Sequence, residues 1–249
     1  MVDARRVWRG TRSDAGLKRK TTRNRGRQSV KNAWRLLLLA AMSEMLAGSP
    51  VHAQTQPSAA EVAGRIDRHY NALHSLEVHY VQRYSGMGME RKESGTLLLK
   101  KPGKMRWTYT DPDGKLFLLD GHDGYFYSPG ETEAQKVDEK KLDDLRSPLR
   151  FLLGHTELEK ELTGLHATCD GSGACVLTGV PKGLDQRVSR MKITAAADGT
   201  IESMEIDETD GVVNQFDFSG ELANAPAPNT AFVFTPPPGV HVVTGEPPV

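Results

Sequence analysis

Residues 95–127 contain short apolar segments separated by turn sequences, and they constrain the fold more than any other part of the chain. Between residues 105 and 109 apolar and polar side chains alternate, which is the period of a β-strand. Pro102-Gly103 and residues 111–114 (Asp-Pro-Asp-Gly) have the composition that turns prefer. This part of the chain therefore predicts strands joined by tight turns.

Two further segments, Leu116–Leu119 and Tyr125–Tyr127, are apolar on both faces. A strand of this kind must meet apolar material on each side. Because few helices are expected elsewhere, we interpret one of these sides as the wall of an apolar cavity. More hairpins are expected from Leu162 onward, so the sequence predicts a mainly β fold in which an antiparallel sheet or barrel packs against a few helices.

Two polar stretches are predicted to lie outside the strands. Residues 86–93 follow a predicted strand at Glu77–Tyr84 and are expected to be a polar connection. Residues 136–144 are densely charged and are expected to form a solvated loop or a short helix. Neither stretch has the alternation that would extend a strand through it.

Two segments predict helices. Ser58 and Glu61 have the spacing of a capping box, and an apolar stripe follows them, so we expect a helix from Ala59. Ser147–Gly154 (SPLRFLLG) begins with residues that suit a helix start and ends with glycine. This second helix has almost no polar face, so it is either a core plug or part of a lid over a cavity.

The first 53 residues are expected to be an export region and not part of the fold. Residues from about 30 to 53 have a basic start, an apolar run at Leu36–Leu46 and small residues before a cut after Ala53. The apolar run is too short to span a membrane. We therefore predict a cleaved signal peptide and, from residue 54 to residue 249, one domain exported to the periplasm.

Residues 1–29 are a basic extension in front of this signal. A nucleic-acid-binding arm and a later translation start, such as Val30, are the two interpretations, and we favour the later start. Residues 1–53 hold 12 of the 32 Lys+Arg but 3 of the 32 Asp+Glu, which leaves residues 54–249 with 20 basic and 29 acidic side chains. A net charge of −9 in this part disfavours binding to nucleic acid.

The two cysteines flank a turn sequence. Cys169 and Cys175 enclose Asp-Gly-Ser-Gly-Ala and could face each other across a hairpin. Export makes a disulfide permissible, so we predict a structural disulfide between them. A redox-active pair is the alternative, although the spacing is not C-x-x-C.

The sequence contains little that indicates catalysis or metal binding. His69, His74 and His79 recur every five residues, but this spacing splays their rings on a helix, so no metal site is expected. Motifs for serine hydrolases, zinc proteases, nucleotide phosphates and dinucleotides are absent. We therefore expect no catalytic residue, no cofactor and a binding protein in place of an enzyme.

Several segments together resemble the outer-membrane lipoprotein carrier protein (LolA) family, over residues 61–240. No single motif is specific, but their order and spacing are. The matching segments are the aromatic-x-Gln strand Tyr80-Val81-Gln82, KKPGKMRW at 100–107, DGHDGYFYSP at 120–129, SPLRFLLG at 147–154 and FVFTPPPGV at 232–240.

The resemblance implies a single curved antiparallel sheet that forms an unclosed half-barrel, with helices as a lid over an apolar cavity for acyl chains. Such proteins are shuttles without catalytic activity, and we expect this chain to be a monomer. They take lipidated proteins from an inner-membrane ABC-type release complex and pass them to an outer-membrane acceptor.

The resemblance also assigns roles to residues. We expect the lid to consist of Ser147–Gly154 and the helix from Ala59. The family has an arginine before the turn proline that fastens the lid, and this chain has Lys101, which should form a weaker latch because an ammonium cannot bond two carbonyls as a guanidinium does. The residues expected to line the cavity are Tyr80, Met105, Trp107, Phe117, Leu119, Tyr125, Tyr127, Phe151 and Leu152.

Two other functions fit a similar chain. A related half-barrel could sense mislocalised lipoproteins and signal to a membrane partner, but such a sensor usually carries a second domain. An exported lipid hydrolase is the other alternative, since catalytic groups can be scattered in sequence. Turnover of acyl esters by the purified protein would favour the hydrolase.

Overall fold

The computed structural model describes residues 56–138 and 154–245. Within these ranges the chain forms one twelve-stranded sheet, two α-helices and a short 3-10 helix. The predicted signal region and most of the predicted helix at 147–154, including Phe151 and Leu152, lie outside the described residues. None of the helices in the described ranges is long and apolar enough to cross a membrane.

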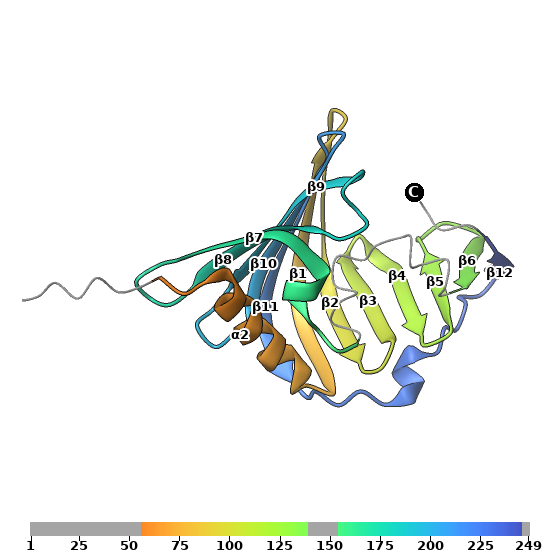
Figure 1. Ribbon diagram of the computed structural model, residues 1–249. Helices are drawn as coiled ribbons and strands as arrows, with labels where there is room; N and C mark the ends of the chain where they lie inside the picture. The colour runs from red at the N-terminus through yellow and green to blue at the C-terminus, as the bar shows by residue number, and fades with distance from the viewer. Residues whose placement is uncertain (1–55, 139–153, 246–249) are drawn as a thin grey trace, which may run out of the picture. The chain divides into compact units, whose positions relative to one another are not determined.

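The sheet is almost entirely antiparallel (Figure 1). Its strand order is β12-β6-β5-β4-β3-β2-β1-β11-β10-β9-β8-β7, and only the β12–β6 pair is parallel. The strands are β1 (Ser75–Gly86), β2 (Met89–Lys100), β3 (Lys104–Asp111), β4 (Asp113–Asp120), β5 (Asp123–Tyr127), β6 (Glu133–Asp138), β7 (Leu162–Cys169), β8 (Cys175–Pro181), β9 (Val188–Ala195), β10 (Ile201–Glu208), β11 (Val213–Ala223) and β12 (His241–Thr244).

The sheet does not close on itself. Its edge strands, β12 and β7, do not pair with each other, so the predicted mainly β fold with an unclosed half-barrel is confirmed. Helix α2 (Ala59–Asn71) lies across one face of the sheet, as Figure 1 shows. Helix α4 (Leu158–Glu161) leads into β7, and the 3-10 helix η2 (Asn229–Phe232) follows β11.

Helix α2 begins as the sequence predicts. Ser58 Oγ accepts a hydrogen bond from the Glu61 backbone N–H at 3.2 Å, and the Glu61 carboxylate accepts one from the Ser58 N–H at 2.7 Å. This capping box satisfies two donors that a helix start otherwise leaves free. The apolar stripe of the helix, with Val62, Ile66 and Tyr70, is buried against the sheet.

The prediction of a polar connection at residues 86–93 is wrong. β1 and β2 form a long hairpin whose turn is Met87-Gly88, with both residues at positive φ. The strands continue through this polar stretch because cross-strand pairing needs no apolar side chain where the sheet faces water. The Gly-Met-Gly sequence at 86–88 was the available turn signal.

The prediction of a loop or helix at 136–144 is also wrong where the structure describes it. Residues up to Asp138 belong to β6, and residues 139–144 lie outside the described ranges. Ala134 and Val137 of β6 are fully buried, which the surrounding charges obscure in the sequence. Two buried apolar positions are enough to hold a short strand in the sheet.

The structure contains a disulfide between Cys169 and Cys175. The two residues face each other at the ends of β7 and β8, where the strand register pairs them directly. A loop this short, with a sequence separation of 6, stabilises the hairpin by about 2 kcal/mol.

Candidate functional site

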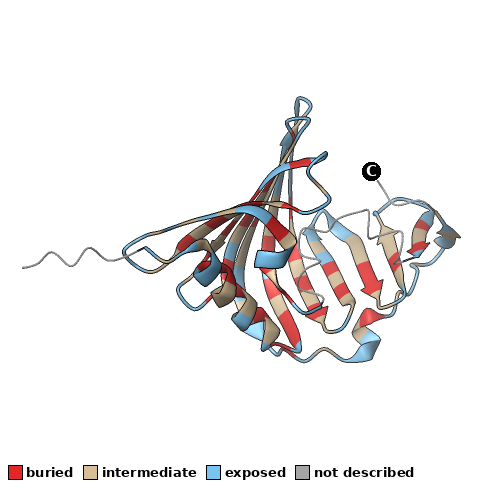
Figure 2. Ribbon diagram, in the orientation of Figure 1, coloured by how far each residue is buried: buried red, intermediate tan, exposed pale blue. Residues whose placement is uncertain are grey.

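Strand pairing defines an inner face of the sheet, on which α2 packs. One row across β2, β3, β4 and β5 consists of Leu97, Trp107, Phe117 and Phe126, each directly opposite the next. Directly opposed residues of antiparallel strands point to the same face. The neighbouring row contains Leu99, Met105 and Leu119, and most of these side chains are buried. Figure 2 shows bands of buried residues across β2, β3 and β4.

Five residues that the sequence assigns to a cavity lie on this inner face. Tyr80, Met105, Trp107 and Leu119 are buried, and Phe117 is half-buried. Tyr80 makes an edge contact with Trp107, with ring centroids 4.5 Å apart. Phe117 stacks on Phe126, also at 4.5 Å. The structure therefore brings these residues into one apolar and aromatic surface.

Tyr125 and Tyr127 are on the opposite, outer face, so the prediction that they line the same cavity is wrong. Tyr125 pairs with Leu118 on one side and Lys136 on the other, and its ring stacks on Phe234 at 5.1 Å. Because all three residues of 125–127 are apolar, the sequence does not say which of them points inward. The register shows that it is Phe126.

The outer face beneath β3 and β4 is covered by the C-terminal segment. Arg106 Nη1 donates a hydrogen bond to the Ala231 carbonyl at 3.0 Å. Leu118 and Phe232 are both almost fully buried in this region. The outer face is thus occupied by the chain itself, which leaves the inner face as the candidate binding surface.

Lys101 contacts helix α2. Its Nζ donates a hydrogen bond to the Tyr70 carbonyl, in the last turn of the helix, at 2.7 Å. A cation at this end also interacts favourably with the helix dipole. Partial burial lowers the pKa of Lys101. The ammonium makes one such contact, as a point donor should, and its role as a latch stays a prediction.

A second attachment of α2 was not predicted from the sequence. Glu221 of β11 accepts a hydrogen bond from the Tyr70 hydroxyl at 3.0 Å, and its other oxygen lies 2.6 Å from His69 Nε2. The Tyr70 hydroxyl in turn accepts from the Ile201 N–H at 2.9 Å. Burial, followed by the nearby Glu221 charge, raises the pKa of Tyr70.

No sequence signal connects these groups, because Glu221 is about 150 residues from the helix. The contact with Glu221 also gives a structural role to His69, which is one of the three evenly spaced histidines. Among residues 56–138 and 154–245, no group of three or more His, Cys, Asp or Glu side chains is placed to hold a metal ion.

A small pocket separates α2 from the sheet. It is lined by Tyr70, Leu76, Val78, Leu97, Ile201, Phe218 and Glu221. Its cavity volume is only about 10 Å³, far below the roughly 300–1,000 Å³ typical of ligand pockets. With α2 in this position the helix fills the space above these strands, and the predicted acyl cavity stays a prediction.

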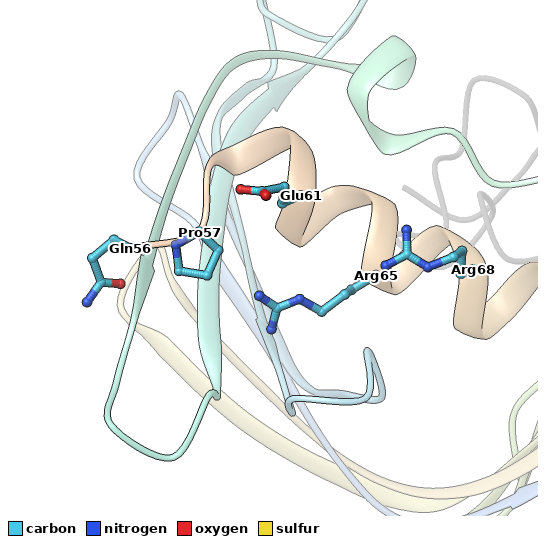
Figure 3. Close-up of a pocket in the computed structure, with 5 residues that line it drawn as sticks. All are labelled: Gln56, Pro57, Glu61, Arg65 and Arg68. Atoms are coloured by element: carbon cyan, nitrogen blue, oxygen red, sulfur yellow. The ribbon is translucent and has the colours of Figure 1, made fainter. Parts of the chain in front are cut away.

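A polar pocket lies on the other side of α2. Figure 3 shows Gln56, Pro57 and Glu61 at its rim, with Arg65 and Arg68 extending along the helix. Glu61 is already engaged by the capping box. The charged lining does not suit an acyl chain, so the inner face remains the better candidate.

The described residues thus form an open, almost entirely antiparallel sheet whose apolar inner face carries a helix. Residues 71–235 match the family model described as "Outer membrane lipoprotein carrier protein LolA". The chain belongs to this family.

Named relatives agree with this assignment. The outer-membrane lipoprotein carrier protein of Cupriavidus necator is 32% identical over 195 residues, covering 75% of this chain and 90% of the relative. The carrier protein of Nitrosospira multiformis is 31% identical over 153 residues, covering 61% and 72%. These relatives are named as carriers and not as enzymes.

Two solved structures align with most of this chain at low similarity. A LolA superfamily protein of Nitrosomonas europaea is 11% identical with a TM-score of 0.40, covering 72% of this chain and 98% of that one. MucB is 14% identical with a TM-score of 0.40, covering 71% and 62%. Likeness at this level does not bear on function.

Proposed function

We propose that this protein is a periplasmic carrier that binds the acyl chains of lipoproteins on the inner face of its sheet and carries them from the inner to the outer membrane. It would receive them from an inner-membrane ABC-type release complex and deliver them to an outer-membrane acceptor. Family membership supports the carrier role. The observation that carries the proposal is the apolar inner face beneath a helix held by a few polar contacts.

The energetics require that α2 compete with the cargo. Burial of one CH₂ group is worth about 0.8 kcal/mol, so a chain of some fourteen would gain on the order of 11 kcal/mol. A rigid, empty cavity would hold such a chain almost irreversibly. A helix that returns to the same surface lowers the apparent affinity by the fraction of molecules in which the surface is open.

The buried stripe of α2 is suited to this competition. Val62 and Ile66 are almost fully buried against the same cluster that contains Leu97 and Trp107. Displacing the helix would expose these apolar side chains while the acyl chain buries its own. The difference between the two burials would set the affinity, which allows cargo to be both accepted and released.

Displacement of a fluorescent dye tests the proposal. A triacylated lipopeptide should displace anilinonaphthalene sulfonate from the purified protein at micromolar concentration, and the same peptide without acyl chains should not. Phe117→Ser should lower the affinity for the acylated peptide by about tenfold, because it removes a half-buried ring of the inner face.

Tyr127→Ser is the matched control, because this half-buried ring lies on the outer face. It should leave the affinity for the acylated peptide unchanged. Absence of displacement by the acylated peptide would contradict the carrier role.

A further inference from the structure

The inner face changes from apolar to polar side chains toward the β1–β2 turn. We call this group the polar belt, and its members are Gln82, Glu93, Tyr109, Lys115 and Asn214. Gln82 lies directly opposite Glu93 and follows Tyr80 by two positions on the same face of β1. The belt therefore borders the apolar surface that contains Trp107 and Met105.

The members of the polar belt satisfy one another. Lys115 Nζ lies 2.7 and 2.8 Å from the two carboxylate oxygens of Glu93, which is only 6% exposed. The same ammonium lies 4.4 Å from the centre of the Tyr109 ring. Gln82 donates a hydrogen bond to Asn214 at 2.9 Å. None of these groups needs a ligand to complete its contacts.

The Tyr80 hydroxyl is different. Tyr80 is 1% exposed, and its hydroxyl lies close to that of Tyr109. The geometry of the two groups falls short of a hydrogen bond, and no other partner lies within residues 56–138 and 154–245. Most buried polar side chains have a partner, so an unpaired hydroxyl at this position requires an explanation. Burial raises the pKa of Tyr80, so the hydroxyl stays protonated.

Its position matches the polar end of an acyl ligand. The ring of Tyr80 contacts Trp107 and Tyr109, at 4.5 and 5.7 Å between centroids, so it stands where the apolar surface meets the polar belt. An acyl chain with its tail on the apolar surface has its carbonyl at its polar end. A carbonyl oxygen accepts a hydrogen bond and brings no charge into a buried site.

Building on the proposed function, we propose that Tyr80 is a specificity residue whose hydroxyl donates a hydrogen bond to the carbonyl of a bound acyl chain. The tail would then run along Trp107 and Met105, and the linkage to the cargo would face the polar belt. The interaction fixes the direction in which the chain lies and selects acyl esters or amides over plain hydrocarbons and ethers.

The test compares an ester with an ether of the same length. Dioctanoylglycerol and dioctylglycerol ether are used to displace anilinonaphthalene sulfonate from the purified protein. The wild type should bind the ester about fivefold more tightly, the usual net effect of one hydrogen bond. Tyr80→Phe should lower the affinity for the ester to that for the ether, and the affinity for the ether should not change.

Tyr127→Phe, on the outer face, is the matched control and should keep the ester preference. Infrared spectroscopy of a ¹³C-labelled ester gives a second measurement that needs no variant. The carbonyl band should move to lower frequency when the ester binds the wild type.

The outcomes separate this inference from the proposed function. If ester and ether bind the wild type equally, or if folded Tyr80→Phe keeps the preference, the role of Tyr80 is wrong while the carrier function stands. An unshifted carbonyl band in the bound ester would also overturn it. If neither lipid displaces the dye but the triacylated lipopeptide does, the inference is wrong and the carrier function stands; if the lipopeptide also fails, both are wrong.

Discussion

Lys100 and Lys101 are neighbours in sequence but attach different parts of the molecule. Lys101 donates to the Tyr70 carbonyl of α2 on the inner face. Lys100 donates to the Ala227 carbonyl and to the Asn229 side chain, both at 2.9 Å, in the segment after β11. The pair therefore offers a test of the latch with a control one residue away.

Replacement of Lys101 by methionine should make the inner face easier to open. Loss of one charge-assisted hydrogen bond of about 1–2 kcal/mol raises the open fraction, so the affinity for anilinonaphthalene sulfonate should rise about fivefold or more. Lys101→Arg should bind the dye no more tightly than the wild type, because a guanidinium keeps the donor. Lys100→Met should leave the dye affinity unchanged, and an unchanged affinity in Lys101→Met would argue against the latch.

Tyr109 makes stability depend on alkaline pH. Burial, followed by the Glu93 charge, raises the pKa of Tyr109 to about 12, above its usual 10. The folded state therefore holds this proton more tightly than the unfolded state, so the contribution is complete below pH 10 and is lost as the pH rises toward 12. Urea unfolding between pH 9 and 12 should show a shallower loss of stability in Tyr109→Phe than in the wild type. Equal losses of unfolding free energy in the two proteins would show that Tyr109 does not contribute to the alkaline loss of stability.

At the residue scale the sequence was informative where polar and apolar side chains alternate. Met105 and Trp107 have polar neighbours, so their shared face could be predicted, and both lie on the inner face. Tyr125 and Tyr127 lack such neighbours, and their direction depends on pairing with Leu118 and Leu116, which the sequence does not specify. Glu221 was missed because its partners are far away along the chain.

Helix α2 is joined to its surroundings by polar contacts near both α4 and β11. Asp67 accepts hydrogen bonds from the Leu158 N–H at 3.1 and 3.2 Å, and Asn71 exchanges hydrogen bonds with the Thr156 backbone at 2.9 and 2.8 Å. Burial raises the pKa of Asp67. The helix therefore carries a partly desolvated charge, which makes its position less stable than apolar packing alone would suggest.

The capping box should contribute measurably to the stability of this helix. Ser58→Ala removes the side-chain acceptor for the Glu61 N–H and should lower the free energy of unfolding by about 1 kcal/mol. Urea denaturation followed by circular dichroism measures the change. Glu61→Gln keeps an oxygen that can accept a hydrogen bond from the Ser58 N–H, so this variant should lose less unfolding free energy than Ser58→Ala. Equal stability of Ser58→Ala and the wild type would show that α2 does not depend on its cap.

At the element scale local chemistry predicted the start of α2 better than the lengths of the strands. The Ser58–Glu61 pattern located α2 because a cap uses residues only three positions apart. The extension of β1 and β2 to Gly86 and Met89 is determined by their pairing with each other, and their polar side chains conceal it. β6 was missed for the same reason.

For the whole molecule, the order of turns and apolar segments was enough to predict an antiparallel sheet or barrel with helices, and the resemblance to the carrier family implied a single unclosed sheet. The parallel pairing of β12 with β6 closes no hairpin and has no local signal, so it could not be predicted. The sequence also could not show how α2 packs on the inner face, because that depends on contacts of α2 with α4, β7, β8, β10 and β11 that are distant in sequence. The proposed function requires that a bound acyl chain can displace α2 from the inner face.

Hydrogen–deuterium exchange with and without a triacylated lipopeptide tests that replacement most directly. We predict that the peptide accelerates exchange of the backbone amides of α2 and slows exchange in β1, β2 and β3, because acyl chains take the place of the helix on the inner face. The deacylated peptide should change neither. If bound acyl peptide leaves α2 as protected as before, or protects it further, helix and cargo do not compete for the same surface and the account is contradicted.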